Sequence, residues 1–240
     1  MSRSIIQTSN PTVEIVQPAD LTTYLHGYAG TEDDFLSTLI ASARNYVEDM
    51  TGYCLAERDF VQYADRFPMF PFAPSALGPL YGVVTPFVGG PVTSFPAGFE
   101  AKRNPFEITL WRYPVLEVSK IVYNDMNGNP VELEPGTDFI ADCTSEPARV
   151  CPMGNKFWPQ LYMVGPKAVA IYLTAGYDSD PNALTTEDPP RAVGYPPILK
   201  LLVMQLAAHW YLNRDLSQVP ATINQLLLSN RVVDYNPSIE

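Results

Sequence analysis

Histidine is the side chain best suited to proton transfer near neutral pH, and the chain contains only two, His26 and His209. His209 lies in the stretch QLAAHWYLNRD, residues 205–215, where Gln205, His209 and Asn213 would share one face of a helix. A general base needs a pocket and an orienting partner, and a lone histidine on an apolar helix is more often a hydrogen-bonded structural group. We therefore predict a structural role for this polar stripe, with partners inside the domain or across a subunit boundary. We expect His209→Ala to impair folding or assembly and to cause no catalytic defect.

Metal coordination is not indicated by the residues that could provide it. The two histidines have no second ligand one helical turn away. The stretch NDMNGN, residues 124–129, lacks both the acidic spacing of a calcium loop and its glutamate at the twelfth position. Cys54, Cys143 and Cys151 include no Cys-x-x-Cys pair, so we expect reduced, partly buried thiols. We predict no metal site and no cofactor.

Paired carboxylates could support hydrolysis, and the number of acidic residues alone does not exclude it. Glu32, Asp33 and Asp34 are explained by the positive N-terminus of a helix, and many of the others alternate with apolar residues on strands. The chain has neither a Gly-x-Ser-x-Gly nucleophile motif nor a glycine loop for phosphate. We therefore predict no catalytic residues and no enzyme activity, and we retain an acid-pair hydrolase as an alternative.

The composition is that of a folded, acidic, β-rich protein. The net charge is −11, from 15 basic and 26 acidic residues, which argues against tight binding of nucleic acid. The 24 prolines, 14 tyrosines and 11 phenylalanines favour short strands and loops anchored by aromatic rings. No apolar run of about 18 residues occurs, and the first residues lack the apolar stretch of a signal peptide. We expect a protein that is made in a cytoplasm and does not associate with a membrane.

Helical patterns occur at both ends of the sequence. In residues 31–52, apolar side chains recur at offsets of three and four, with Thr31 as the expected N-cap, Asp34 completing a capping box and Gly52 as the stop. A short helical turn is expected near residues 18–28. Near the C-terminus, a helix that begins at the Pro196-Pro197 pair is apolar nearly all round and therefore buried, and a shorter one follows Pro220.

Between these helical regions the apolar residues alternate, as they do on strands. Asn127-Gly128 is the dipeptide that tolerates positive φ at the tip of a tight hairpin. We predict an α+β fold, in which a small helical bundle of N-terminal and C-terminal helices packs with one compact antiparallel β-sheet over residues 55–176. The expected strands are residues 58–67, 106–113, 117–125, 138–142, 148–152 and 167–177.

A long segment rich in proline, glycine and aromatic residues, residues 67–104, interrupts the strand series. It carries no charge between Phe67 and Phe99, so its exposed surface would be adhesive. We predict that it contacts an adjacent subunit or a partner protein, and the alternative is that it folds over its own sheet. Its aromatic residues are Phe67 and the six predicted interface residues Phe70, Phe72, Tyr81, Phe87, Phe95 and Phe99.

Two further segments are assigned by composition. Residues 177–195 read as an acidic, proline-containing linker. The C-terminal tail, residues 233–240, belongs to the alternating segment RVVDYNPSIE, residues 231–240, in which Val232, Val233 and Tyr235 could add a strand to a partner protein. The alternative for this tail is a frayed terminus.

Several motifs in a fixed order resemble the head-tail connector proteins of tailed bacteriophages, also called adaptor or head-completion proteins. The resemblance covers residues 15–65 and 105–232, and it implies that residues 1–66 and 105–232 form a single connector domain. The motifs are EDDFLSTLIASARNYVEDMTGYCL, YPVLEVSKIVYNDMNGNPVELEPGTDFIAD, SEPARVCP, KAVAIYLTAGY and PPILKLLVMQLAAHWYLNRD.

The resemblance implies a ring, commonly of twelve copies, beneath the portal protein at the capsid vertex, with the tail or a tail-completion protein on its other side. Genomic DNA would pass through the lumen without sequence-specific binding, and an acidic lumen would discourage DNA from sticking. The expected location is the virion neck, after assembly in the host cytoplasm. A β-rich, tail-associated module that binds a glycan or receptor through the aromatic insertion remains a further alternative.

Overall fold

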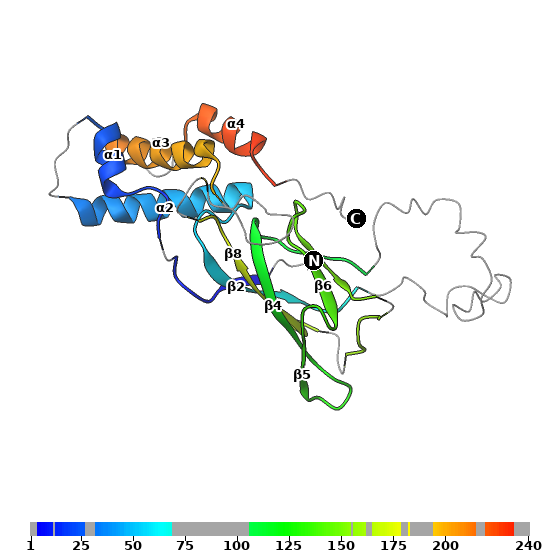
Figure 1. The fold of residues 1–240 in the computed structure, drawn as a ribbon. Coiled ribbons are helices and arrows are strands. Elements are labelled where there is room, and N and C mark those ends of the chain that lie inside the picture. The colour runs from blue at the N-terminus through cyan, green and yellow to red at the C-terminus, as the bar shows by residue number, and fades with distance from the viewer. Residues whose placement is uncertain are drawn as a thin grey trace, which may run out of the picture.

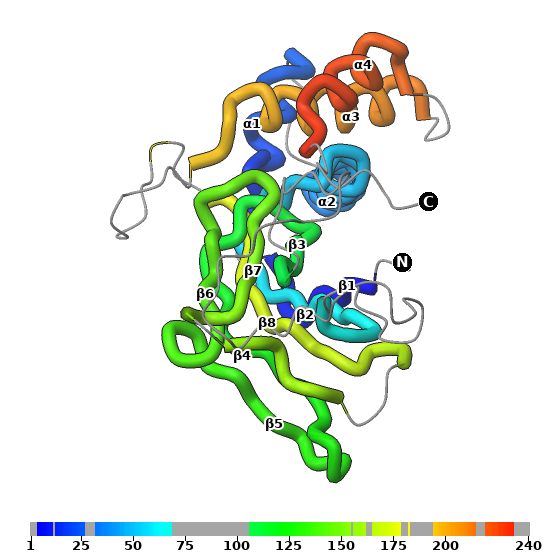
Figure 2. Tube along the Cα trace, turned by 90° about the vertical axis from the view of Figure 1, so that its right-hand side faces the viewer, coloured from blue at the N-terminus to red at the C-terminus, as the bar shows by residue number. Residues whose placement is uncertain are grey.

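In the part of the chain that the structure describes, four helices form a layer at one end of a body made of antiparallel strands, so the fold is α+β, as predicted (Figure 1). The structure is a computed structural model. It describes residues 4–11, 13–26, 32–68, 106–154, 156–161, 165–178, 182, 194–214 and 219–232. A view from the side shows the same division between the helices and the strands (Figure 2).

The helices are α1 (Pro18–Tyr24), α2 (Asp33–Thr51), α3 (Pro197–Asn213) and α4 (Ala221–Ser229). The prediction of Thr31 as the N-cap of α2 is wrong, because Glu32 holds that position without a side-chain capping bond, and Thr31 lies outside the described residues. The predicted stop is confirmed, since Gly52 has a φ of 83° and donates its N–H to the Glu48 carbonyl at 2.9 Å.

The helices enclose an apolar core of their own. α2 buries Leu36, Leu39, Ile40, Ala43 and Val47, which lie at the predicted helical spacing. α3 buries seven side chains against its neighbours but leaves two leucines on its outer side exposed, so its burial is less complete than its apolar sequence suggests. The two leucines are Leu201 and Leu212.

The strands form two sheets rather than the single sheet predicted. The larger sheet has the order β1-β2-β8-β4-β5, and the smaller has the order β3-β7-β6. Every pair of neighbouring strands is antiparallel. The bounds are β1 (Ser4–Gln7), β2 (Arg58–Ala64), β3 (Ile108–Thr109), β4 (Val115–Asn124), β5 (Pro130–Leu133), β6 (Phe139–Asp142), β7 (Arg149–Pro152) and β8 (Val169–Ala175).

The single-sheet prediction failed because alternation shows which side chains are buried but not which strands pair. Between β5 and β6 the chain turns through Pro135 and Gly136, whose φ is 74°, so β6 pairs with β7 and not with β5. The two sheets then bury their inner faces in one shared core, with Phe139 and Val150 of the small sheet joining Ile121 of the large one.

Two strands differ from their predictions in extent. β1 was not predicted, and it pairs with β2 from Ser4–Tyr63 to Gln7–Phe60 at the edge of the larger sheet. The predicted strand 106–113 is reduced to the two residues of β3. The Asn127-Gly128 hairpin is confirmed: Gly128 has a φ of 83°, and the Asp125 carboxylate accepts the N–H groups of Asn127 at 2.8 Å and Asn129 at 2.9 Å.

Candidate functional site

The polar stripe of α3 lies at the surface of the helical layer. Gln205 and His209 are half-buried and Asn213 is exposed. The Asn213 side-chain amide donates to the His209 carbonyl at 2.9 Å and lies 2.9 Å from His209 Nδ1. Two members of the stripe therefore have a partner within α3 itself, and its role in folding or assembly stays a prediction.

A buried cluster of charges lies between α2 and the strands. We call it the α2 charge cluster, and it consists of Glu14, Arg44, Glu48, Arg58 and Arg112. Arg44 bridges two carboxylates, with Nε 2.8 Å from Glu14 and Nη1 3.1 Å from Glu48. Arg58 pairs with the same Glu48 oxygen. Arg44, Glu48 and Arg58 are no more than 5% exposed.

Glu48 is the central acceptor of this cluster. Its Oε1 accepts the Leu55 backbone N–H at 2.8 Å, and its carbonyl accepts Arg112 Nη1 at 3.2 Å. The Arg58 guanidinium lies 5.3 Å from the centre of the Phe60 ring. Its Nε and Nη1 have no hydrogen-bond partner among the described residues, and the ring face supplies a favourable contact for that charge. The cluster thus connects α2 to β2 and to the segment that leads into it.

This arrangement is suited to holding layers together and not to turning over a substrate. Its central charges are buried and paired, and a buried charge that loses its partner destabilises the fold. The sequence alone did not indicate the α2 charge cluster. The available signal was the pair Arg44 and Glu48, spaced i, i+4 on the face of α2 that also carries Ala43 and Val47.

Trp158 contacts both of the segments that border the aromatic insertion. Phe67 stacks on the indole ring with centroids 4.9 Å apart, and Trp158 Nε1 donates to the Phe106 carbonyl at 2.6 Å. Phe67, counted with the insertion in the sequence, is instead 2% exposed in the core of the sheets. Phe70, Phe72, Tyr81, Phe87, Phe95 and Phe99 lie outside the described residues.

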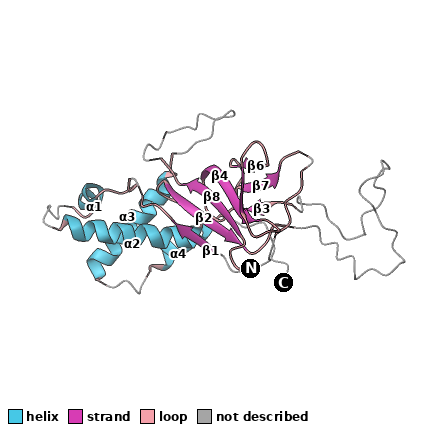
Figure 3. Ribbon diagram, turned by 90° about the horizontal axis from the view of Figure 1, so that it is seen from below, coloured by secondary structure: helices cyan, strands magenta, loops and turns pink. Residues whose placement is uncertain are grey.

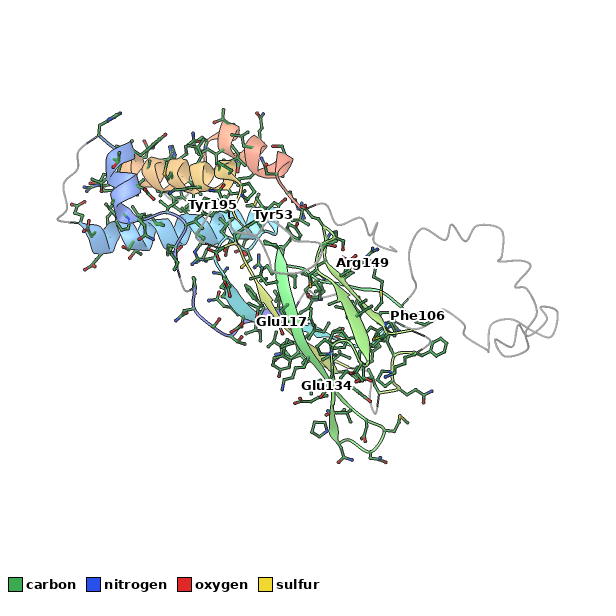
Figure 4. The ribbon with its side chains drawn as sticks, viewed as in Figure 1. Tyr53, Phe106, Glu117, Glu134, Arg149 and Tyr195 are labelled. Carbon is green, nitrogen blue, oxygen red and sulfur yellow. The ribbon has the colours of Figure 1, made fainter. Side chains whose placement is uncertain are left out.

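The C-terminal segment and the linker also meet the helical layer. The Val232 N–H donates to the Thr51 carbonyl at 2.8 Å, while Val233 and Tyr235 lie outside the described residues. Both ends of the predicted linker belong to the body of the domain, because Tyr177 and Tyr195 are buried in the helical core. Figure 4 places Tyr195 and Tyr53 beside the helices and Phe106 toward the other end of the molecule.

Among the described residues, every carboxyl group with a shifted pKa is shifted downward. The acid-pair hydrolase hypothesis instead predicts a carboxyl group with a raised pKa. Burial would raise the pKa values of Asp20 and Asp142, but their hydrogen bonds outweigh burial and lower both. The pKa of Asp125 is lowered by backbone hydrogen bonds, and that of Asp138 by its bond with Lys156. These directions give the hydrolase hypothesis no support.

Cys54 and Cys143 are buried and Cys151 is half-buried, and burial raises the pKa of Cys54 to about 12. The described part of the chain contains no group of three or more His, Cys, Asp or Glu side chains that could hold a metal ion. No described helix has the length and apolar character needed to span a bilayer.

The fold is similar to that of chains in gene transfer agent (GTA) particles. A chain from the neck of an empty GTA particle, computed with C6 symmetry, is 19% identical, with a TM-score of 0.62 over 96% of both chains. A chain from the virion of the native particle is 18% identical, with a TM-score of 0.63 over 95% of both. A chain from the native neck, computed with C12 symmetry, is 17% identical, with a TM-score of 0.59 over 96% of both. No protein-family model and no curated protein matches the sequence.

Proposed function

We propose that this chain is a structural, non-enzymatic component of the neck of a phage-like particle. The observation that carries the proposal is the likeness to neck chains, which extends over 96% of both chains and therefore includes the helices and both sheets. The order of the sequence motifs supports the same role independently of the fold. In this role the chain is a head-tail connector that assembles into a ring between the portal protein and the tail or a tail-completion protein.

The two cores of the chain are linked in a way that suits a subunit of a ring. The helical core and the core of the sheets are linked by the α2 charge cluster, so the layers cannot separate without exposing buried charge. The C6 and C12 symmetries of the similar neck structures support a ring of identical copies, and we propose twelve. We further propose that the ring is part of the virion, after assembly in the host cytoplasm.

The charge of the chain suits a lumen through which DNA passes. With 26 acidic and 15 basic residues, the protein carries a net negative charge that repels phosphate. We propose that acidic side chains line the lumen and let DNA pass without sequence-specific binding. A lumen lined mainly by lysine and arginine would contradict this part of the proposal.

The insertion and the C-terminal tail are the proposed contacts with other proteins of the neck. Deletion of residues 70–99 removes all six aromatic residues predicted for the interface. It leaves Phe67 and Phe106, which contact Trp158 on either side of the insertion. We expect a folded protein that no longer joins heads to tails. Unchanged joining would remove the insertion from the interface. Truncation after Val232 tests Val233 and Tyr235 in the same assay.

Negative-stain electron microscopy of the purified chain, alone and with the portal protein, tests the neck role directly. We expect rings in at least one of the two preparations. In a second experiment, on whole particles, we expect a labelled antibody against the chain to bind at the head-tail junction. Label confined to tail fibres would favour the receptor-binding alternative, and absence of the chain from particles would overturn the proposal.

A further inference from the structure

Two groups of exposed apolar side chains lie at opposite ends of the molecule. The helices occupy one end and the small sheet of β3, β6 and β7 lies toward the other, in two perpendicular views (Figures 1 and 3). Exposed apolar side chains that cluster, unlike scattered ones, indicate a contact surface. We propose that these two patches bind each other in neighbouring copies of the chain. The inference deepens the proposed neck function and rests on it.

The helical patch consists of Phe35, Tyr211 and Leu212. Phe35 is 52% exposed at the start of α2, and its ring centroid lies 6.3 Å from that of Tyr211 at the end of α3. Leu212 follows Tyr211 and is 65% exposed. The Tyr211 hydroxyl donates to Glu32 at 2.9 Å, which fixes this ring at the surface. Asp33 and Asp34, both exposed, border the patch together with Glu32 and give it an acidic rim.

The sheet patch consists of Phe106, Ile140, Met153 and Phe157. Phe157 is 63% exposed and meets the Phe106 ring edge-on at 5.5 Å. Ile140 and Met153, on the outer side of the small sheet, are 58% and 39% exposed. Lys156 lies within this patch, since its N–H donates to the Met153 carbonyl at 3.1 Å, and its side chain is 51% exposed.

Carboxylates border the helical patch, and cations lie at the sheet patch. The helical patch is bordered by three carboxylates at the N-terminus of α2. The sheet patch contains Lys156, and the outer side of the same small sheet carries Arg149. Both cations also form ion pairs within the chain: Lys156 pairs with Asp138, and Arg149 pairs with Asp142 and Glu107. The pairs of these half-exposed cations are weak enough for each cation to share a partner across an interface.

A second copy of the chain is the partner that this placement fits. A closed ring of identical subunits uses a head-to-tail contact, which requires two different surfaces on each copy. One self-complementary patch would instead give a two-fold dimer. Two dissimilar patches at opposite ends meet the requirement of a ring.

The experiment compares Phe35→Ser and Phe157→Ser in the full chain, with Leu228→Ser as the matched control. Leu228 lies on α4 and is 58% exposed, so the control removes a similarly exposed apolar side chain outside both patches. Sedimentation equilibrium measures self-association, and thermal unfolding checks the fold. We expect each patch variant to associate at least about tenfold more weakly than the wild type, with unchanged unfolding, and Leu228→Ser to behave as the wild type.

A mixture of the two patch variants separates a head-to-tail contact from a two-fold one. The Phe157→Ser copy keeps its helical patch and the Phe35→Ser copy keeps its sheet patch, so one copy of each should form a mixed pair. Both patches left over in that pair are damaged, so we expect no assembly larger than a pair. Failure of the mixture to form pairs would overturn the inference, as would a wild-type chain that stays monomeric at every concentration.

Other occupants of the sheet patch give different results. If residues 69–105 of the same chain cover it, Phe157→Ser will lower the unfolding temperature and leave self-association unchanged. If the portal or a tail protein covers it, Phe157→Ser will weaken binding of that protein alone. Both results overturn the contact between copies. Rings that persist in both patch variants would also overturn it while leaving the neck function intact.

Discussion

At the scale of single residues, Gly176 shows how closely two segments can approach when one lacks a side chain. It follows β8, has a φ of 136°, and donates its N–H to the Pro114 carbonyl at 2.9 Å. A Cβ atom at this position would lie 2.5 Å from the Ala56 carbonyl carbon and oxygen. Both atoms belong to the backbone and cannot rotate away, so the position accepts only glycine.

Gly176→Ala should therefore lower the free energy of unfolding by about 2–4 kcal/mol, because strain at a positive φ adds to the steric overlap. Gly128→Ala is the matched control. Gly128 also has a positive φ, of 83°, but a Cβ there would meet nothing within 4 Å, so we expect a loss of only about 1 kcal/mol. Urea unfolding of both variants measures the difference, and equal losses would contradict the role of the close approach.

At the scale of secondary-structure elements, the α2 charge cluster connects the helical layer to the strands. Glu48 neutralises Arg44 and Arg58 at once, and its Oε1 also holds the Leu55 N–H. The net contribution of such buried pairs to stability is small, but removal of one charge leaves its partners uncompensated in an apolar surrounding.

Glu48→Gln should lower the free energy of unfolding by about 3–5 kcal/mol, since Arg58 loses its buried counter-charge and Arg44 keeps only that of Glu14. Asp49→Asn removes the neighbouring carboxylate, whose side chain is 74% exposed and pairs with Arg112 at the surface. The expected loss there is below about 1 kcal/mol. Chemical denaturation at neutral pH distinguishes the two, and a Glu48→Gln loss as small as that of Asp49→Asn would show that the cluster does not hold the layers together.

Asp142 closes the turn between β6 and β7. Its Oδ2 pairs with Arg149 Nε at 2.9 Å, and its Oδ1 accepts the Thr144 hydroxyl at 2.8 Å and the Ser145 N–H at 3.2 Å. Burial would raise its pKa, but these hydrogen bonds and the arginine charge outweigh burial, so its pKa lies below the ordinary value.

A lowered pKa in the folded state means that the charged form of Asp142 favours folding. Its contribution is complete above the unfolded-state pKa of about 4 and is lost as the pH falls through the folded-state pKa. Asp142→Asn should therefore be less stable than the wild type at pH 7, and the difference should shrink below about pH 4. Unfolding curves across this range measure the difference, and one that grew in acid would contradict the assigned sign.

At the scale of the whole molecule, the acidic balance and the arrangement of surfaces determine what the chain can bind. A net charge of −11 leaves too few cations for a continuous contact with phosphates. The apolar patches at the two ends, in contrast, suit protein partners.

The purified chain should therefore show no measurable affinity for duplex DNA at physiological salt, where proteins with several phosphate contacts bind with dissociation constants of about 1–100 µM even without specificity. Fluorescence anisotropy with a labelled duplex tests this over a range of salt concentrations. Binding that weakens steeply as salt increases would reveal a basic surface that the composition does not indicate, and would contradict an acidic lumen.

The sequence by itself determined the helices and the hairpin, because spacing on one helix face and the Asn127-Gly128 turn are local properties. It also indicated the α+β class and, through the order of its motifs, the likeness to neck proteins. Only the tertiary structure decided the division into two sheets, the addition of β1 at the edge, the α2 charge cluster and the closure of the insertion at Trp158. Each of these joins residues far apart in the chain, and a pattern of alternating apolar residues specifies which side chains are buried without specifying which segment lies against them.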